Sequence, residues 1–138
     1  MKILIATHGH LADGIKSTLS LFVDVSTIEC INAYVDDGDQ DIESKIKAFM
    51  DACPHDQISI IFTDLLGGRV NQVVMRLLDR DEIKVIAGFN PALILEIMTT
   101  PIESEDELNA IIEQARTQMT LVKLDKRPVE INDDDFLA

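Results

Sequence analysis

The sequence predicts an α/β protein in which helices cover both faces of a doubly wound, mainly parallel sheet of four strands. Four short apolar runs alternate along the chain with longer segments of helical periodicity, which is the pattern of repeated strand and helix units. Hydrophobic residues make up 46% of the 138 residues, whereas aromatic residues make up only 4%. An aliphatic core of this kind is expected where a parallel sheet lies between helices, and the length suits one domain.

The first half of the chain predicts two strand and helix pairs. An apolar run makes residues 2–7 the first strand, and residues 11–22 form a helix because apolar residues recur there at helical spacing. Its inward stripe is expected to be Leu11, Ile15, Leu19 and Phe22. Residues 27–35 form the second strand. The aspartate-rich turn that follows can cap a helix that begins near Gln40 and ends at Pro54. The inward face of that helix is expected to hold Ile42, Ile46 and Phe49.

The second half repeats the pattern. Strands are expected at residues 57–63 and 82–87, with a helix that begins after Gly68 between them. The apolar residues of that helix are Val70, Val73, Val74, Leu77 and Leu78. Pro91 suits the first turn of the next helix, which runs to about Thr99.

The C-terminal part is expected to contain one more helix and a polar end. Ser104 and Glu107 have the spacing of a capping box at the start of that helix. Residues 121–124 extend this helix or form a short fifth strand, and the sequence does not decide between the two. We expect residues 1–124 to form the folded domain and residues 125–138 to form an acidic tail.

Right-handed crossovers between these units favour the strand order 2-1-3-4. In that order the first and third strands are neighbours, and their chains leave toward opposite faces of the sheet. His8 follows the first strand and Asp64 follows the third. Both side chains are therefore expected to lie at the same edge, beside the crevice where α/β proteins bind ligands.

Composition excludes several classes of function. The formal net charge of −13 disfavours binding to nucleic acid or to anionic membrane surfaces and favours basic protein partners. No apolar stretch approaches the length of a membrane-spanning helix, and the N-terminus reads as a strand rather than a signal peptide, so a cytoplasmic protein is expected.

Cys30, Cys53 and His55 lack the spacing of a metal site, and two unreactive thiols and a surface histidine are expected.

A histidine beside a carboxylate is suited to nucleophilic chemistry. If Asp64 accepts a hydrogen bond from one ring nitrogen of His8, the other nitrogen presents its lone pair. Amides that follow Gly9, Gly67 and Gly68, together with the positive ends of two helix dipoles, can hold a phosphoryl group on that nitrogen. His10 is a second candidate nucleophile or a helix cap.

Three segments resemble a known family. They are the motif Ile5-Ala6-Thr7-His8-Gly9-His10, the motif Thr63-Asp64-Leu65-Leu66-Gly67-Gly68-Arg69-Val70-Asn71, and the motif Val85-Ile86-Ala87-Gly88-Phe89-Asn90-Pro91. In this order and spacing they resemble the enzyme IIA component of mannose-type sugar phosphotransferase systems (PTS). The likeness covers residues 1–124.

The resemblance implies a cytoplasmic phosphocarrier. In such a protein, His8 accepts a phosphoryl group from phosphorylated HPr and passes it to an enzyme IIB, and Asp64 hydrogen-bonds the imidazole. The resemblance further implies a homodimer, no metal or organic cofactor, and only indirect contact with the membrane components IIC and IID. The family commonly has Ser-Pro after the double glycine, whereas this chain has Arg69 and Val70. We expect Arg69 to supply a charged donor in place of the serine hydroxyl.

Other interpretations stay open. The phosphocarrier subunit of a dihydroxyacetone kinase has a similar fold and also uses an early histidine, and a non-catalytic α/β binding module would take no phosphoryl group at all. Histidine phosphatases carry an arginine where this chain has Thr7, and receiver domains need an acidic pair where Thr7 and His8 stand.

Overall fold

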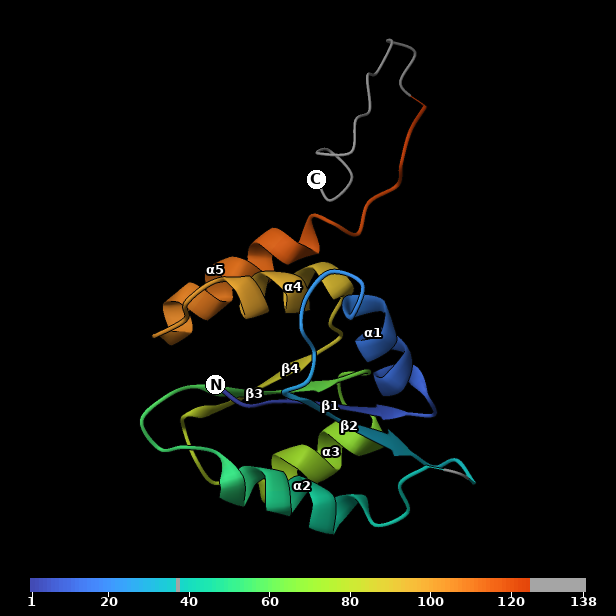
Figure 1. Ribbon diagram of the computed structural model, residues 1–138, viewed down its shortest axis with the longest axis vertical. Helices are drawn as coiled ribbons and strands as arrows, with labels where there is room; N and C mark the ends of the chain where they lie inside the picture. Colours follow the sequence, from blue (N-terminus) through green and yellow to red (C-terminus); the bar gives the residue numbers. More distant parts are fainter. Residues whose placement is uncertain (37, 125–138) are drawn as a thin grey trace.

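The computed structural model, which describes residues 1–36 and 38–124, is a sandwich of two helical layers around one sheet (Figure 1). Its four strands are parallel and lie in the order β2-β1-β3-β4, as the sequence predicts. They are β1 (Ile3–His8), β2 (Ile28–Ala33), β3 (Ser59–Thr63) and β4 (Ile83–Ala87). The helices are α1 (Leu11–Leu19), α2 (Ile42–Ala52), α3 (Arg69–Leu77), α4 (Pro91–Thr99) and α5 (Glu105–Arg116).

Each face of the sheet has its own aliphatic core. Helices α2 and α3 cover one face, and α1, α4 and α5 cover the other (Figure 1). Successive side chains of a strand point to opposite faces, so Leu4 packs on the side of α2 and α3 while Ile3 and Ile5 pack on the opposite side. Both faces are buried, which explains why the strands read as continuous apolar runs.

Helix α1 differs from the prediction in length and in orientation. It ends at Leu19, and its buried residues are Ala12 and Leu19, with Ile15 partly buried. The predicted stripe was wrong at both ends, because Leu11 is 47% exposed and Phe22 is 38% exposed. The first apolar residue therefore faces solvent next to the end of β1.

Two helix caps also differ in detail from the sequence patterns. Helix α2 is capped by Asp41, which accepts a hydrogen bond from the Ser44 N–H, and not by the preceding turn. Ser104 caps α5 as predicted, but the Glu107 carboxylate accepts from the N–H of Glu103 instead of completing the box at Ser104. Residues 121–124 form neither a helix nor a strand, and residues 125–138 of the expected tail lie outside the described part.

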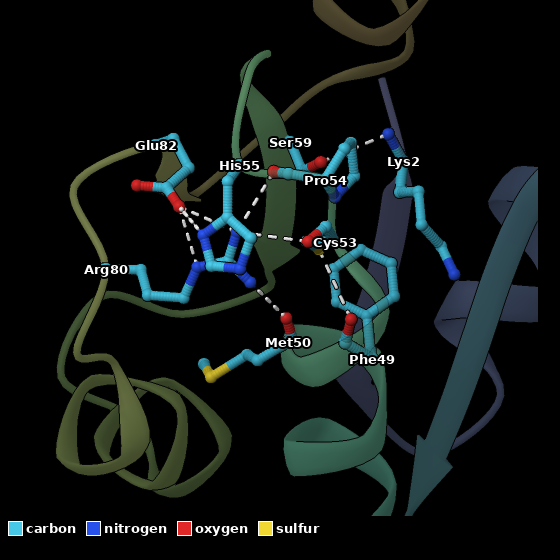
Figure 2. Close-up of polar contacts among 9 residues, drawn as sticks. All are labelled: Lys2, Phe49, Met50, Cys53, Pro54, His55, Ser59, Arg80 and Glu82. Carbon is cyan, nitrogen blue, oxygen red and sulfur yellow. Dashed lines mark hydrogen bonds and ion pairs between the residues drawn. The ribbon is translucent and has the colours of Figure 1, made fainter.

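Arg80 holds together the end of the sheet opposite His8 (Figure 2). Its guanidinium donates to the carbonyls at the end of α2 and to Glu82, and Glu82 also contacts His55. The carbonyl acceptors are those of Met50, Cys53 and Pro54, at 2.7 to 3.0 Å. The His55 side chain is 81% exposed, in keeping with the surface position expected from the sequence.

Two further findings concern membrane-spanning helices and the two cysteines. No helix in the described ranges is long and apolar enough to cross a bilayer. Both cysteines are free: Cys53 is buried and donates to the Phe49 carbonyl, while burial, followed by the nearby Asp13 carboxylate, raises the pKa of Cys30 to about 11.

Candidate functional site

The structure brings His8 and Asp64 together at the carboxyl ends of β1 and β3. Asp64 Oδ2 lies 2.9 Å from His8 Nδ1 and also accepts the backbone N–H of His8 at 2.9 Å. The other carboxylate oxygen accepts the N–H of Leu65 at 3.0 Å. The His8 side chain is 39% exposed and that of Asp64 is 10% exposed. Asp64 thus holds one side of the imidazole, while the ring remains partly exposed to solvent.

This contact determines which ring nitrogen carries the proton. Burial is the largest influence on the pKa of Asp64 and raises it, but the hydrogen bonds and charge of His8, with the N–H of Leu65, outweigh burial and lower that pKa. Asp64 is therefore ionised at neutral pH and can only accept, so Nδ1 of His8 carries the proton. Nε2 is left with its lone pair, as a phosphoryl acceptor requires.

Glycines shape both loops that surround the imidazole. Gly9 (φ 60°) and Gly67 (φ 75°) have the left-handed backbone that favours glycine. A side-chain carbon at Gly68 would lie 3.5 Å from His8 Cε1 and only 3.1 Å from the Leu65 carbonyl oxygen, so glycine permits this close approach to the ring.

The amides of these glycines already have acceptors in the structure. The N–H of Gly9 donates to the Ala33 carbonyl, and that of Gly68 to the Leu65 carbonyl. The N–H of Gly67 donates to a side chain, Asn71 Oδ1, at 3.1 Å. Only the last of these acceptors is a side-chain group that can turn away without breaking a backbone turn.

The residues that immediately precede the two helices after the site strands do not cap them. His10 precedes α1 and Gly68 precedes α3, and neither makes a capping hydrogen bond through its side chain. In α1 the N–H groups of Ala12 and Asp13 donate instead to Thr7 Oγ1 and Asn32 Oδ1. In contrast, Asp41, Asn90 and Ser104 cap the three remaining helices. The starts of α1 and α3 carry partial positive charge from the helix dipole, and both are at the edge where His8 lies. This edge is therefore electrostatically suited to an anion.

Arg69 lies at the same edge, where it is near a residue that was not predicted to belong to the site. Its guanidinium carbon is 5.8 Å from the centre of the Tyr34 ring, and that ring is 5.5 Å from the His8 imidazole. Tyr34 follows β2 directly, and β2 pairs with β1, so the strand order itself was a signal for its proximity to His8.

Two buried threonines and one asparagine also support the site and were not predicted. Thr7 and Thr63 precede His8 and Asp64, and their hydroxyl oxygens accept hydrogen bonds from α1 and from Asn71. The signal in the sequence was a polar residue at the end of each apolar strand. Within the described residues, no group of three or more His, Cys, Asp or Glu side chains is placed to hold a metal ion.

Comparisons with known proteins give a family match and similar solved structures. The family model described as EIIA-man, PTS system fructose IIA component, matches residues 2–116. A comparison with curated proteins by sequence gives no match.

Solved structures share the fold. The mannose/sorbose-specific IIA subunit of the phosphotransferase system from Enterococcus faecalis has a TM-score of 0.75 and 24% identity, over 92% of this chain and 98% of that one. The PTS IIA protein associated with the fucose utilization operon from Streptococcus pneumoniae has a TM-score of 0.70 and 25% identity, over 87% and 91% of the two chains. The EIIA component from Streptococcus agalactiae has a TM-score of 0.71 and 24% identity, over 88% and 95%.

Proposed function

The chain belongs to the EIIA-man family of PTS IIA components, and on that premise we propose that His8 accepts a phosphoryl group from phosphorylated HPr and passes it to an enzyme IIB. Family membership makes the protein a phosphotransferase component with a phosphocarrier role. The observation that carries the assignment to His8 is the 2.9 Å contact between its Nδ1 and Asp64, which leaves Nε2 as the nucleophile.

The proposed step is a transfer between two histidines. The Nε2 lone pair attacks phosphorus, the bond between phosphorus and the donor imidazole breaks, and its electron pair returns to the donor nitrogen. The proton on Nδ1 stays in its hydrogen bond to Asp64 throughout. Because the donor is an activated phosphoramidate, the protein mainly positions the reactants and stabilises charge, and it does so with its own residues. Transfer to enzyme IIB is the same step in reverse.

Three features support phosphoryl binding at this edge. The start of α3 offers N–H groups, and the starts of both α1 and α3 offer positive dipole ends. Gly9 and Gly68 keep side chains away from the phosphoryl group, and the N–H of Gly67 can exchange Asn71 for a phosphoryl oxygen. Arg69 supplies the charged donor in place of the serine that is common in the family.

The surface around His8 supports a protein partner. Leu65 and Leu66 are 63% and 86% exposed beside Asp64, and Leu11 is exposed next to the end of β1. An apolar surface of this kind within an acidic chain matches a partner that presents apolar and basic groups, which is the character expected of HPr. We further propose that residues 1–124 are the phosphocarrier domain, that it acts in the cytoplasm, and that it reaches IIC and IID only through IIB.

A homodimer is part of the proposal. Four apolar side chains beyond α5 are each more than 80% exposed: Met119, Leu121, Val122 and Leu124. A segment this apolar is expected to be covered by another protein surface. Light scattering after size-exclusion chromatography should give twice the chain mass, and a monomer at all concentrations would contradict the dimer.

The test is phosphorylation in a reconstituted system. The protein is incubated with phosphoenolpyruvate, enzyme I and HPr, and intact mass is measured at neutral pH. We expect a gain of about 80 Da that is lost in acid and is absent from His8→Gln, but present in the matched control His10→Gln. Transfer from His8 to a dihydroxyacetone kinase instead of to an enzyme IIB would favour the kinase subunit, and no adduct with any donor would favour a binding module.

Arg69 is tested separately. Arg69→Ala should accept the phosphoryl group about tenfold more slowly, because a hydrogen bond to a charged group is lost. Arg76→Ala is the matched control, since it removes an equal charge from an exposed position on the same helix, where the arginine pairs with Glu43. Equal acceptance and hydrolysis rates in Arg69→Ala and wild type would exclude the role.

A further inference from the structure

Tyr34 is near two groups of the site, the imidazole of His8 and the guanidinium of Arg69. Its ring is 5.5 Å from the His8 imidazole, tilted by 49°, and the Arg69 guanidinium carbon is 5.8 Å from the same ring. The ring is therefore in contact distance of the proposed phosphoryl acceptor and of the proposed donor cation. Tyr34 is 47% exposed, so it is not part of the core of the protein.

The backbone of Tyr34 has an energetically costly conformation. Its φ of 65° is the only positive value at a non-glycine residue in the described part of the chain. Aromatic residues rarely adopt this left-handed region, in which their side chain crowds the backbone. The preceding residue, Ala33, pairs with His8 and accepts the N–H of Gly9, so the chain turns sharply at the site itself. Costly conformations of this kind persist mainly where they serve a function.

Arg69 has an unusual partner for this chain. Each of the other arginines in the described ranges has a carboxylate partner, in the pairs Arg76–Glu43, Arg80–Glu82 and Arg116–Glu113. Arg69 instead lies over an aromatic ring, although the sequence contains 25 acidic residues. A guanidinium held by a ring keeps its N–H groups available for an incoming anion, whereas a guanidinium bound to a carboxylate does not.

The backbone next to Arg69 also lies against the imidazole. A side-chain carbon at Gly68 would be 3.5 Å from His8 Cε1, the ring carbon between the two nitrogens. Arg69 thus directly follows a residue that lies against the imidazole, at the start of α3, where the helix dipole disfavours a cation. An interaction that keeps the guanidinium at this place must therefore offset repulsion from the helix end.

Resting on the proposed function, we infer that Tyr34 is a positioning residue for phosphoryl transfer at His8, and that its ring holds the Arg69 guanidinium beside the phosphoryl group. The ring restricts a long, flexible side chain before the phosphoryl group arrives, so less entropy is lost when the charged hydrogen bond forms. Tyr34 makes this contribution through its aromatic face and not through its hydroxyl.

Four variants separate this role from a structural one. Tyr34→Asn removes the ring and suits the left-handed backbone, so its melting temperature should equal or exceed that of wild type. Tyr34→Phe keeps the ring. Arg69→Ala removes the cation, and the double variant Tyr34→Asn with Arg69→Ala completes a thermodynamic cycle. Arg76→Ala controls for the loss of a positive charge.

The measured quantity is the rate constant for phosphoryl acceptance from phospho-HPr. Tyr34→Asn should be about two- to fivefold slower, the range that an exposed cation–π contact supplies, and Tyr34→Phe should match wild type. In the Arg69→Ala background, Tyr34→Asn should have no further effect. The side-chain Nε–H signal of Arg69 should shift in the NMR spectrum of Tyr34→Asn, while that of Arg76 stays in place.

Other results would overturn the inference. Wild-type rates in Tyr34→Asn, effects of Tyr34→Asn and Arg69→Ala that multiply, or a Tyr34→Phe variant as slow as Tyr34→Asn would each exclude positioning by the ring. These outcomes leave the proposed function intact, because wild type is phosphorylated in all of them. Absence of phosphorylation in wild type would instead defeat the proposed function and this inference with it.

Discussion

Thr7 and Thr63 occupy equivalent positions at the ends of β1 and β3, and each ties its strand to the helix that follows. Thr7 Oγ1 accepts a 2.9 Å hydrogen bond from the backbone of α1, and Thr63 Oγ1 accepts one of 3.0 Å from Asn71 Nδ2 in α3. Both threonines are fully buried. His8 and Asp64 come next in the chain, so these bonds help to set the backbone from which the two side chains of the site project.

Thr63→Val should destabilise the protein although it preserves side-chain shape. The substitution removes the acceptor of Asn71 Nδ2, and Asn71 is only 7% exposed, so a buried donor is left without its partner. We expect a loss of about 1–3 kcal/mol in the free energy of unfolding, measured with urea. Because Asn71 also accepts the N–H of Gly67, phosphorylation of His8 should slow as the loop loosens.

Thr99→Val is the matched control for that substitution. The hydroxyl of Thr99 donates to the Leu95 carbonyl at an exposed position near the end of α4, far along the chain from the site. Its removal should change the free energy of unfolding by less than about 0.5 kcal/mol. Equal effects of Thr63→Val and Thr99→Val would show that the buried hydrogen bond contributes no particular stability.

Asp64→Asn should slow phosphorylation of His8 by roughly a hundredfold or more. The carboxylate accepts three hydrogen bonds, two from His8 and one from Leu65, whereas an amide has one acceptor atom and presents a donor on the other side. The imidazole then loses the charge that fixes its tautomer. Rapid-quench measurement of phosphoryl transfer gives the rate, and Asp51→Asn, at an exposed position in α2, should match wild type.

The stability difference between wild type and Asp64→Asn should depend on pH. Hydrogen bonds and charge from His8 outweigh burial, so the pKa of Asp64 is lower in the folded protein than its usual value. Such a group stabilises the fold above the unfolded pKa of about 3.9, and the contribution is lost as pH falls through the folded pKa. Urea titrations should give a constant difference above about pH 5 that shrinks below about pH 4. A stability difference that grows as the pH falls would contradict a lowered pKa of Asp64 in the folded protein.

The proximity of His8 and Asp64 was predictable, and the strand order also indicated that the residue after β2 lies near His8, but the contact of Tyr34 with Arg69 was not predictable. Parallel strands end at one edge, so the order 2-1-3-4 alone brings the ends of β1 and β3 together. The position of Tyr34 depends on how the loop after β2 folds back, where Asp39 exchanges hydrogen bonds with Asn32 through its backbone and side chain. Hydrogen bonds of this kind within a loop follow no regular spacing along the sequence. The periodicity of apolar residues therefore does not predict them.

The errors at helix α1 and at the cap of α2 have a similar cause. Helical spacing predicts a stripe, but it leaves open which of two adjacent apolar residues faces the sheet, and here Ala12 is buried while Leu11 is exposed. Several acidic residues precede α2, and only the backbone geometry selects Asp41 as the one that reaches an N–H of the first turn. The glycine amides were predicted, from residue type alone, to donate hydrogen bonds to a phosphoryl group. Residue type does not reveal that some of these amides already donate to backbone carbonyls.

Arg80→Lys should destabilise the fold and leave phosphorylation of His8 unchanged. The guanidinium donates to three carbonyls and one carboxylate at the far end of the sheet, and its side chain is only 14% exposed (Figure 2). A lysine ammonium has three donors and no planar fork, so it cannot satisfy all of these acceptors together.

We expect Arg80→Lys to lower the free energy of unfolding by about 2–4 kcal/mol, measured by urea denaturation. Arg76→Lys is the control, because Arg76 is 62% exposed and its pair with Glu43 contributes little. The rate of phosphoryl acceptance should be the same in both variants under conditions where both are folded, since the Arg80 cluster and His8 are at opposite ends of the strands. A slower rate in folded Arg80→Lys would mean that the two ends of the sheet are coupled, and the separation of a stability-determining end from a reactive end would then be wrong.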